Sequence, residues 1–262
     1  MTDLYDRPYQ TDYRNSVWNC GILPVYRQQL YSVYGEYKNT AREFFATVNL
    51  THNREWYNRI YEQRIENGQV QRVSLPLSNH GSGYTVKSTL SKGFYELGLK
   101  TSFLVLLNIS KAEQISGGQR LPYQYRLMRL EPKVIWTPNR HWETSYQTDI
   151  RYGGNKIGER TRLAPLWNVT QQVQLSYIFS PIEASLSVDH YHNDVNEDQS
   201  VNAVFADFSV SWKSGRWQIT TTATNLFDKR TYAYTQYASL ESYTSWVRIR
   251  PREFLVAIRY QL

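Results

Sequence analysis

Strict alternation of apolar and polar side chains constrains this chain of 262 residues more than any other feature. In residues 142–152 one face reads Trp, Thr, Tyr, Thr, Ile, Tyr, and the other reads Glu, Ser, Gln, Asp, Arg. The same period of two recurs in residues 167–179 and 201–212. Because successive side chains of a β-strand point to opposite faces, this period predicts strands with one apolar and one polar face. No segment shows a convincing period of 3.6 residues, so we expect an all-β fold.

The alternation predicts about eleven strands. Short and long connections between these strands alternate without exception. This regularity is typical of an antiparallel up-and-down barrel with one tight rim and one loop-rich rim. The predicted strands are 27–38, 41–52, 82–96, 98–111, 122–136, 141–153, 163–179, 183–193, 200–212, 216–227 and 249–262. The predicted long connections are 53–81, 112–121, 154–162, 194–199 and 228–248.

The polar strand face indicates which side of such a barrel meets water. It carries eleven charged residues, and enclosing them in a small soluble barrel would be costly unless most of them were paired. Trp136 and Trp142 flank one short connection and Trp212 and Trp217 flank another, as in the aromatic girdles of membrane barrels. We therefore expect a transmembrane barrel with a hydrated lumen. The eleven charged residues are Lys87, Lys100, Arg129, Glu131, Lys133, Glu143, Asp149, Arg151, Asp189, Asp207 and Arg259.

Composition and short motifs exclude several other classes of protein. The longest apolar run, 103–107, has five residues, whereas a spanning helix needs about 20. The single cysteine, Cys20, excludes an internal disulfide and a cysteine-based zinc site. The net charge of +7 comes from dispersed basic residues, so we expect no nucleic-acid partner. Residues 1–7 lack the basic start and apolar core of a signal peptide.

The C-terminal residues resemble a known family. One face of the last strand carries Phe254, Val256, Ile258, Tyr260 and Leu262, and this pattern resembles the C-terminal strand that the barrel assembly machinery recognises in bacterial outer-membrane proteins. The usual terminal residue there is Phe, so Leu262 is a mild departure.

Two further motifs precede that strand. The order of Asn-Leu-Phe-Asp-Lys at 225–229, a tyrosine-rich loop, and Arg-Pro-Arg-Glu at 250–253 resembles the end of TonB-dependent receptors, particularly those of the Bacteroidetes. The resemblance covers roughly the last 50 residues.

This resemblance implies half of a 22-stranded barrel in a Gram-negative outer membrane. The whole receptor would import a siderophore, cobalamin, glycan or similar nutrient, and it would receive energy from TonB through an N-terminal plug. The implied partners are outer-membrane lipid, the barrel assembly machinery, the missing barrel half and plug, and TonB. No cofactor and no catalytic residue are implied.

Under this interpretation residues 25–262 are the C-terminal part of the barrel, and residues 1–24 are a loop or part of a preceding strand. The signal peptide, the TonB box and the plug are absent from the sequence. Single-chain bacterial barrels have even strand numbers, so eleven strands also indicate a piece of a larger barrel.

Two alternatives stay open. A self-contained barrel of 10–12 strands would act as a passive pore or adhesin if residues 16–25 supplied a closing strand, although Gly21 and Pro24 disfavour one there. A barrel hydrolase would need Asp189, His190 or His192 for its activity, with Asp189 and His190 polarising a water. We expect no enzyme.

Candidate binding residues fall in two places. His190 and His192 lie two residues apart on one strand face, a spacing that can place two imidazoles on one metal ion, but we favour a polar strand end that runs into an exposed acidic loop and expect no metal. The long connections 53–81 and 228–248 are rich in aromatic residues at the open rim, where barrels contact ligands. We take Trp56, Tyr57, Tyr234 and Tyr237 as candidate ligand contacts; the alternative is that these loops only extend and shield the rim.

Overall fold

The computed structural model describes residues 7–11, 13, 15–66, 69–158, 161–162, 165–196, 198–237 and 242–261. For residues 65–66, 116, 161–162, 236–237 and 242–243 it describes the backbone alone. Nearly all of these residues lie in β-strands, and one short 3-10 helix, η2 (Tyr95–Leu97), occupies a turn. Among the described residues, no helix is long and apolar enough to cross a membrane.

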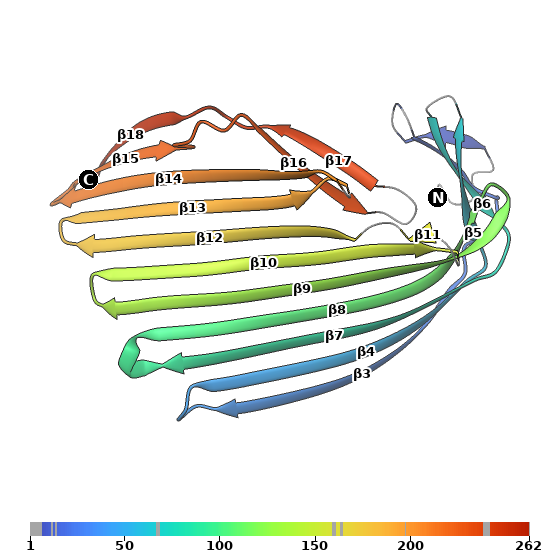
Figure 1. Ribbon diagram of the computed structural model, residues 1–262, viewed down its shortest axis with the longest axis horizontal. Coiled ribbons are helices and arrows are strands. Elements are labelled where there is room, and N and C mark those ends of the chain that lie inside the picture. The colour runs from blue at the N-terminus through green and yellow to red at the C-terminus, as the bar shows by residue number, and fades with distance from the viewer. Residues whose placement is uncertain are drawn as a thin grey trace.

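Eleven long strands form one continuous antiparallel sheet (Figure 1). Each strand pairs with the next along the chain through a regular register. This result confirms the predicted all-β, up-and-down arrangement, and every predicted strand is present. The strands are β3 (Tyr26–Asn39), β4 (Phe44–Tyr57), β7 (Asn79–Phe94), β8 (Leu99–Ser116), β9 (Gln119–Asn139), β10 (Trp142–Ile157), β12 (Leu166–Phe179), β13 (Ile182–Asp194), β14 (Ser200–Ser214), β15 (Trp217–Thr224) and β18 (Glu253–Tyr260).

Seven shorter strands lie outside this sheet path, where the alternation predicts only connections or chain ends. They are β1 (Pro8–Gln10), β2 (Asn15–Trp18), β5 (Ile60–Glu66), β6 (Gln69–Leu75), β11 (Thr161–Arg162), β16 (Thr231–Tyr237) and β17 (Ser242–Arg248). The connections 53–81 and 228–248 thus each contain a hairpin. β2 pairs with β1 and, in parallel, with β6, so the described residues near 16–25 add no strand beside β3.

Two predicted long connections are wrong. β8 and β9 continue through most of 112–121 and meet at a tight turn, where Gly117 and Gly118 have φ of 57° and 75°. Such positive φ values at both central residues are typical of a type I′ hairpin turn. Likewise β10 extends to Ile157, and β11 pairs with its end. The alternation fades in these segments because polar residues occupy both faces, while backbone pairing continues.

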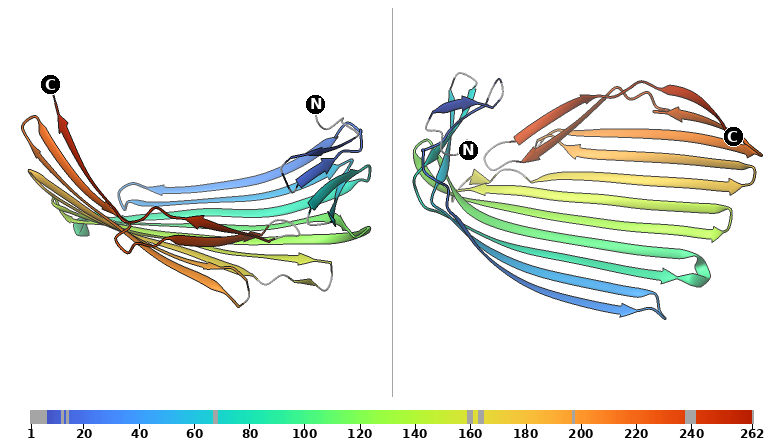
Figure 2. Two further views of the ribbon diagram at one scale, coloured as in Figure 1. Left: turned by 90° about the horizontal axis from the view of Figure 1, so that it is seen from above. Right: turned by 180° about the vertical axis from the view of Figure 1, so that it is seen from behind.

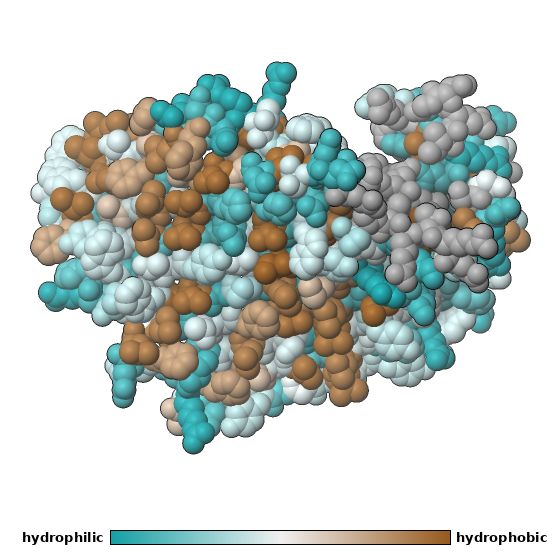
Figure 3. All heavy atoms as spheres, in the orientation of Figure 1, coloured by the Kyte–Doolittle hydropathy of each residue, from teal (hydrophilic) through white to brown (hydrophobic). Residues whose placement is uncertain are grey.

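The two faces of the sheet follow from the register, because residues paired across neighbouring strands share a face. One continuous row runs from Trp142 through Tyr177, Ala184, Val210 and Thr221 to Val256. This apolar face is convex, and hydrophobic side chains spread across it (Figures 2 and 3). All eleven charged residues predicted for the polar face lie on the opposite, concave face.

The sheet is a single open layer, so its buried side chains lie where other segments fold over it. Ile60 and Val73 of the β5–β6 hairpin and Ile115 of β8 are buried at the loop-rich end, where this hairpin pairs with β8. Ala203, Ala206 and Ala233 are buried where β16 lies against β13 and β14. The sheet edge at β3 is exposed along almost its whole length.

Candidate functional site

A tight turn after β15 directs the chain away from the sheet. Asn225 and Asp228 both adopt left-handed backbone conformations, with φ of 50° and 49°, which Asn and Asp tolerate better than most residues. The backbone N–H of Asn225 donates to Asp207 Oδ1 on β14 at 2.7 Å. The chain then forms the β16–β17 hairpin, and it returns to pair β18 with β15.

Residues of the Asn-Leu-Phe-Asp-Lys and Arg-Pro-Arg-Glu motifs form hydrogen bonds with one another at the base of the β16–β17 hairpin. Asn225 Nδ2 donates to the carbonyl oxygens of Lys229 and Arg250, each at 2.8 Å, and Asn225 Oδ1 accepts from the backbone N–H of Lys229 at 2.9 Å. Asp228 accepts hydrogen bonds from the backbone N–H of Arg252 and from Arg230 Nη2, each at 2.9 Å. These residues therefore join the start and the end of the hairpin segment.

The hairpin folds over the concave face (Figure 2, right). Asn193 on β13 donates from Nδ2 to the Tyr232 hydroxyl at 2.9 Å and to the Ala233 carbonyl at 3.3 Å. The rings of Tyr191 and Tyr232 meet edge to face, with centroids 5.2 Å apart. Ala233 and Thr235 are completely or almost completely buried. These contacts bring β16 against the sheet, and a cavity that is partly open to solvent lies between them.

The cavity has a volume of about 470 Å³. This size lies within the range of small-molecule sites in proteins, roughly 300–1,000 Å³. Tyr234 and Thr235 of the hairpin form one wall, and side chains from β8, β9, β10, β12 and β13 form the rest. Those side chains and one glycine are Leu106, Tyr125, Leu127, Arg129, Asp149, Arg151, Gly153, Leu166, Asn168, Thr170 and Asn193.

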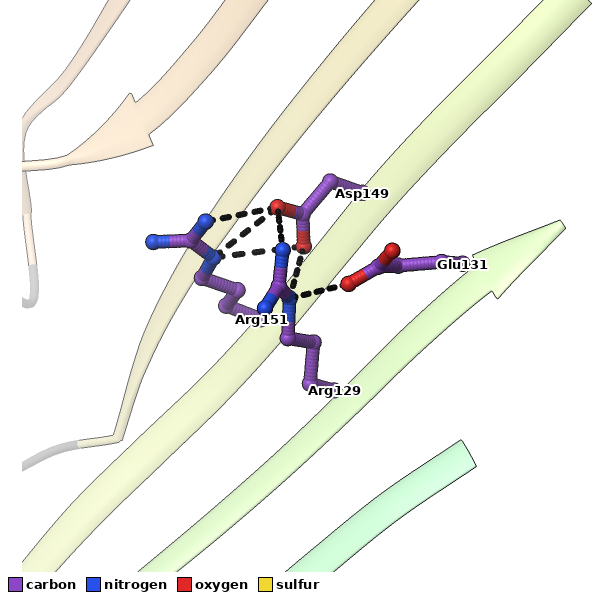
Figure 4. Close-up of polar contacts among 4 residues, drawn as sticks. All are labelled: Arg129, Glu131, Asp149 and Arg151. Atoms are coloured by element: carbon purple, nitrogen blue, oxygen red, sulfur yellow. Dashed lines mark hydrogen bonds and ion pairs between the residues drawn. The ribbon is translucent and has the colours of Figure 1, made fainter. Parts of the chain in front are cut away.

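An ionic cluster lies in and beside this cavity (Figure 4). Arg129 donates from Nε and Nη2 to Asp149 at 3.1 and 2.9 Å. Arg151 donates from Nη2 to Asp149 Oδ2 at 2.7 Å, and its Nε also faces this carboxylate. Glu131 Oε1 lies 2.5 Å from Arg129 Nε, outside the cavity lining. The cavity itself therefore contains two guanidinium groups and one carboxylate.

Strand geometry explains why these four residues meet. Arg151 pairs directly with Arg129 across β10 and β9, so the two guanidinium groups share a face. Asp149 and Glu131 each lie two residues away along the same strands, and residues two apart in a strand point the same way. The sequence places all four on the polar face, but the position of the hairpin above them is a tertiary feature.

The four candidate ligand contacts do not form one site. Tyr234 lines the cavity, whereas the side chain of Tyr237 lies outside the described residues. Trp56 lines a hollow of about 560 Å³ near the loop-rich end of the convex face. Tyr57 points to the concave face, where its hydroxyl donates to Glu55 Oε2 at 2.9 Å and its ring stacks on Tyr26. Trp56 and Tyr57 point apart because they are consecutive strand residues.

The histidine pair lies on the apolar, convex face. His190 Nδ1 is 3.2 Å from Gln171 Oε1, and His192 Nδ1 is 2.9 Å from Asn202 Oδ1. Within the part of the chain that the structure describes, no group of three or more His, Cys, Asp or Glu residues could hold a metal ion. Asp189 points to the opposite face from His190, so the structure does not bring these two side chains together on one water.

The candidate assembly signal lies on the last strand. Phe254, Val256, Ile258 and Tyr260 share the convex face of β18, and all four are exposed. Leu262 lies outside the described residues. Among the strands that are described, only β15 pairs with β18, so its other edge is open.

Comparison of the chain with models of known protein families gives no match. Comparisons with curated proteins and with solved structures give no match either.

Proposed function

We propose that this chain is the C-terminal part of the transmembrane barrel of a TonB-dependent outer-membrane receptor, which takes up a nutrient ligand actively. The observation that carries the proposal is a curved sheet with an apolar convex face, a charged concave face and two open edges (Figure 1). The NLFDK and RPRE motifs at the base of the β16–β17 hairpin add the family resemblance.

The distribution of side chains supports a membrane location. Trp136, Trp142, Trp212 and Trp217 lie beside the tight turns and are exposed on the convex face, as expected for rings at the level of lipid headgroups. The eleven strand charges lie on the concave face, where a hydrated lumen would solvate them. An aqueous environment on both faces would leave the convex apolar face uncovered.

The direction of the two edge strands supports a barrel that further strands complete. β3 and β18 both run toward the tight-turn rim, because an odd number of antiparallel strands separates the two open edges (Figure 1). Direct closure of this sheet on itself would pair β3 with β18 in parallel. An odd number of additional strands restores antiparallel pairing at both seams and gives the even total of bacterial barrels. In lipid, each unpaired backbone group would cost several kcal/mol.

In the proposed receptor the concave face lines the path that a moving plug opens. TonB would deliver the energy through that plug, so no residue of this chain needs to act as a catalyst. The chain would supply the lumen wall, the loop-rich extracellular rim and the lipid-facing belt.

The proposal is tested by immunoblotting outer-membrane fractions with an antibody against residues 228–248, with and without boiling of the sample. We expect an apparent mass far above the 30.9 kDa of this chain. A band near 30.9 kDa that migrates faster before boiling would instead identify a barrel that closes by itself. Detection only outside the outer membrane, or only in aggregates, would also overturn the proposal.

A further inference from the structure

We infer that a row of basic residues near the loop-rich end of the convex face binds the phosphate groups of an outer-leaflet lipid. The inference rests on the membrane location in the proposed function. It goes beyond transport, because it assigns a partner to the outside of the barrel. It requires neither TonB nor a particular nutrient ligand.

The basic residues lie in one row of directly paired positions across five strands. Arg54 on β4 pairs with Ser82 on β7, and Ser82 pairs with Lys111 on β8. Gln124 on β9 pairs with both Lys111 and Lys156 of β10. We call these five residues the basic row. Its cationic members are two strands apart, which places their backbones about 10 Å from one another.

The cations of the basic row are not balanced by carboxylates. Among the described residues, no carboxylate forms an ion pair with Arg54, Lys111 or Lys156. Arg54 Nε donates to His52 Nε2 at 3.2 Å, and an imidazole nitrogen contributes no negative charge. Arg54 and Lys111 are exposed and Lys156 is half-buried, so an anion can reach them from the convex side.

The two carboxylates that line the nearby hollow have partners of their own. Glu113 lies 2.6 Å from Arg120 Nη2, a basic residue outside the row. Glu55 points to the concave face, where its carboxylate accepts hydrogen bonds from Asn53 and Tyr57, each at 2.9 Å. The basic row therefore keeps its positive charge.

All five residues of the basic row line the hollow of about 560 Å³ on the convex face, beside Trp56. Phosphate oxygens accept charge-assisted hydrogen bonds from guanidinium and ammonium groups. The Ser82 hydroxyl and the Gln124 amide lie between the cations in the row, and both can donate further hydrogen bonds. The hollow thus presents an array of donors that suits a phosphorylated headgroup.

The position of the basic row along the strands matches the level of lipid headgroups. A transmembrane strand needs about 9–11 residues to cross the hydrocarbon, and the part of β10 from Trp142 to Tyr152 supplies that length. Lys156 lies beyond Tyr152 on the same face, so it lies outside the hydrocarbon.

The neighbouring rows of the convex face support this placement. One row closer to the middle of the sheet, the His52 ring stacks with Tyr31 and Tyr84, with centroids 6.2 and 4.3 Å apart. Tyrosine rings are enriched at membrane–water interfaces. The row after that is apolar, and it consists of Val33, Leu50, Val86, Leu107 and Met128. Basic, aromatic and apolar rows thus follow the order of phosphate, interface and acyl chains in a lipid leaflet.

The cations are confined to one sector of the convex face. Near the loop-rich ends of β13 and β14, the described convex residues are His192, Asp194, Ser200 and Asn202. None of these is Lys or Arg, and His192 Nε2 lies 3.4 Å from an Asp194 oxygen. A localised basic cluster indicates a site for a particular lipid, because basic pockets on membrane proteins bind anionic headgroups. Since the loop-rich end of a bacterial barrel faces outside, we assign this lipid to the outer leaflet, as a glycolipid that carries phosphate.

The test is native mass spectrometry of the native protein, purified from outer membranes in detergent and titrated with diphosphoryl lipid A. We expect saturable binding. Fully dephosphorylated lipid A should bind at least about tenfold more weakly, because it cannot accept the charge-assisted hydrogen bonds. Equal binding of the two lipids would overturn the inference. Displacement of lipid A by excess inorganic phosphate would overturn the assignment to a lipid and identify a site for free phosphate.

Variants assign the binding to the basic row. R54Q/K111Q/K156Q should bind lipid A about a hundredfold more weakly, since each cation near a charged membrane surface contributes about fivefold. R54K/K111R/K156R keeps the cations and should stay within about fivefold of the wild type.

The matched control is K87Q/K100Q/R259Q, which removes the same number of positive charges from the concave face. It should leave the affinity for lipid A within about twofold of the wild type, because these residues lie on the other side of the sheet. An equal loss in this control would show that net charge alone governs binding and would overturn the inference.

Each variant is first checked for native β-sheet circular dichroism and for the heat-dependent gel mobility of the wild type. If R54Q/K111Q/K156Q does not fold, K111Q alone should weaken lipid A binding about fivefold. Wild-type affinity in a folded variant would overturn the inference. A band near 30.9 kDa in the immunoblot would refute the receptor proposal, yet lipid A binding can be measured on that smaller barrel, so the two proposals can fail separately.

Discussion

At the scale of single residues, the turn after β15 shows what the Asn-Leu-Phe-Asp-Lys motif does physically. Asn225 combines a left-handed backbone with a buried side chain whose two polar atoms are both satisfied. Its amide links the exit of the chain from the sheet to Arg250, which lies just before the return. The motif therefore has a structural role here, independent of any ligand.

We predict that N225A destabilises the protein by about 2–4 kcal/mol. The change removes three hydrogen bonds, each contributing about 1 kcal/mol, and places a Cβ-bearing residue without a local hydrogen bond in the left-handed region. Urea unfolding of the protein in detergent, followed by heat-dependent gel mobility, measures the change.

N225G is the matched variant for this position, because glycine adopts positive φ without strain but lacks the amide. Its loss of stability should be smaller than that of N225A, and the difference isolates the backbone contribution. Equal stability of N225A and the wild type would show that the side-chain hydrogen bonds of Asn225 do not stabilise the protein.

At the scale of elements, each long strand is amphipathic, and β14 shows the pattern clearly. Phe208 lies near the middle of this strand on the convex face, and Ser209 follows it on the concave face. Ser209 makes a hydrogen bond with Ser185, at 2.8 Å between their hydroxyl oxygens, within the polar surface. Neighbouring residues of one strand therefore occupy environments of opposite polarity.

We predict that F208R disrupts membrane assembly whereas S209R is tolerated. Arg on the lipid face near the membrane midplane costs about 2–4 kcal/mol, whereas lumen positions accept charge. The measurement is the fraction of protein that reaches the outer membrane in heat-modifiable form. Equal assembly of the two variants would contradict a lipid-facing convex side.

The short hairpins mark the limit of strand prediction at this scale. β5, β6, β16 and β17 are seven residues long each, and they lie within stretches rich in polar and aromatic residues. A clean apolar alternation appears only where one face meets an apolar phase and the other meets water. β16 packs against β13 and β14, and β5 and β6 pair with β8 and β2, so the two faces of these hairpins are not sorted in that way.

At the scale of the whole molecule, the two ends of the sheet differ in the length of their connections. The tight turns after β3, β7, β9, β12 and β14 lie at one end of the sheet, and the longer connections lie at the other, together with the tight turn between β8 and β9 (Figure 1). In bacterial barrels the short turns face the periplasm and the long loops face the outside. For the proposed barrel, this asymmetry predicts that the end with most of the tight turns faces the periplasm.

We predict opposite accessibility of the two ends in intact cells. With Cys20 replaced by Ser, D198C in a loop at the long-connection end should react with a membrane-impermeant maleimide without permeabilisation. R140C, in a tight turn, should react only after the outer membrane is opened. Both positions are exposed, so access to reagent is the variable that differs. Labelling in the reverse order would invert the proposed orientation.

The amino-acid sequence by itself determines the eleven long strands, apart from their extensions into 112–121 and 154–162, and the identity of their faces. Period-two alternation encodes both, because it reflects a local geometric rule that holds along every long strand. The sorting of Arg129, Asp149 and Arg151 onto the polar face is predictable for the same reason. The tight turn at Gly117 and Gly118 also has a local signature, which a search for paired glycines would find.

Only the tertiary structure decides what happens to the long connections and to the candidate site. The β16–β17 hairpin reaches the concave face through Asn193, about 40 residues away in the sequence, and forms one wall of a cavity that Arg151 and Asn168 also line. Trp56 and Tyr57 lie on opposite faces because they are consecutive strand residues, and only the tertiary structure shows that both lie outside the cavity under that hairpin. Alternation specifies the face on which a side chain lies, but it carries no information on which distant segment covers that face, since packing between segments depends on contacts without a sequence period.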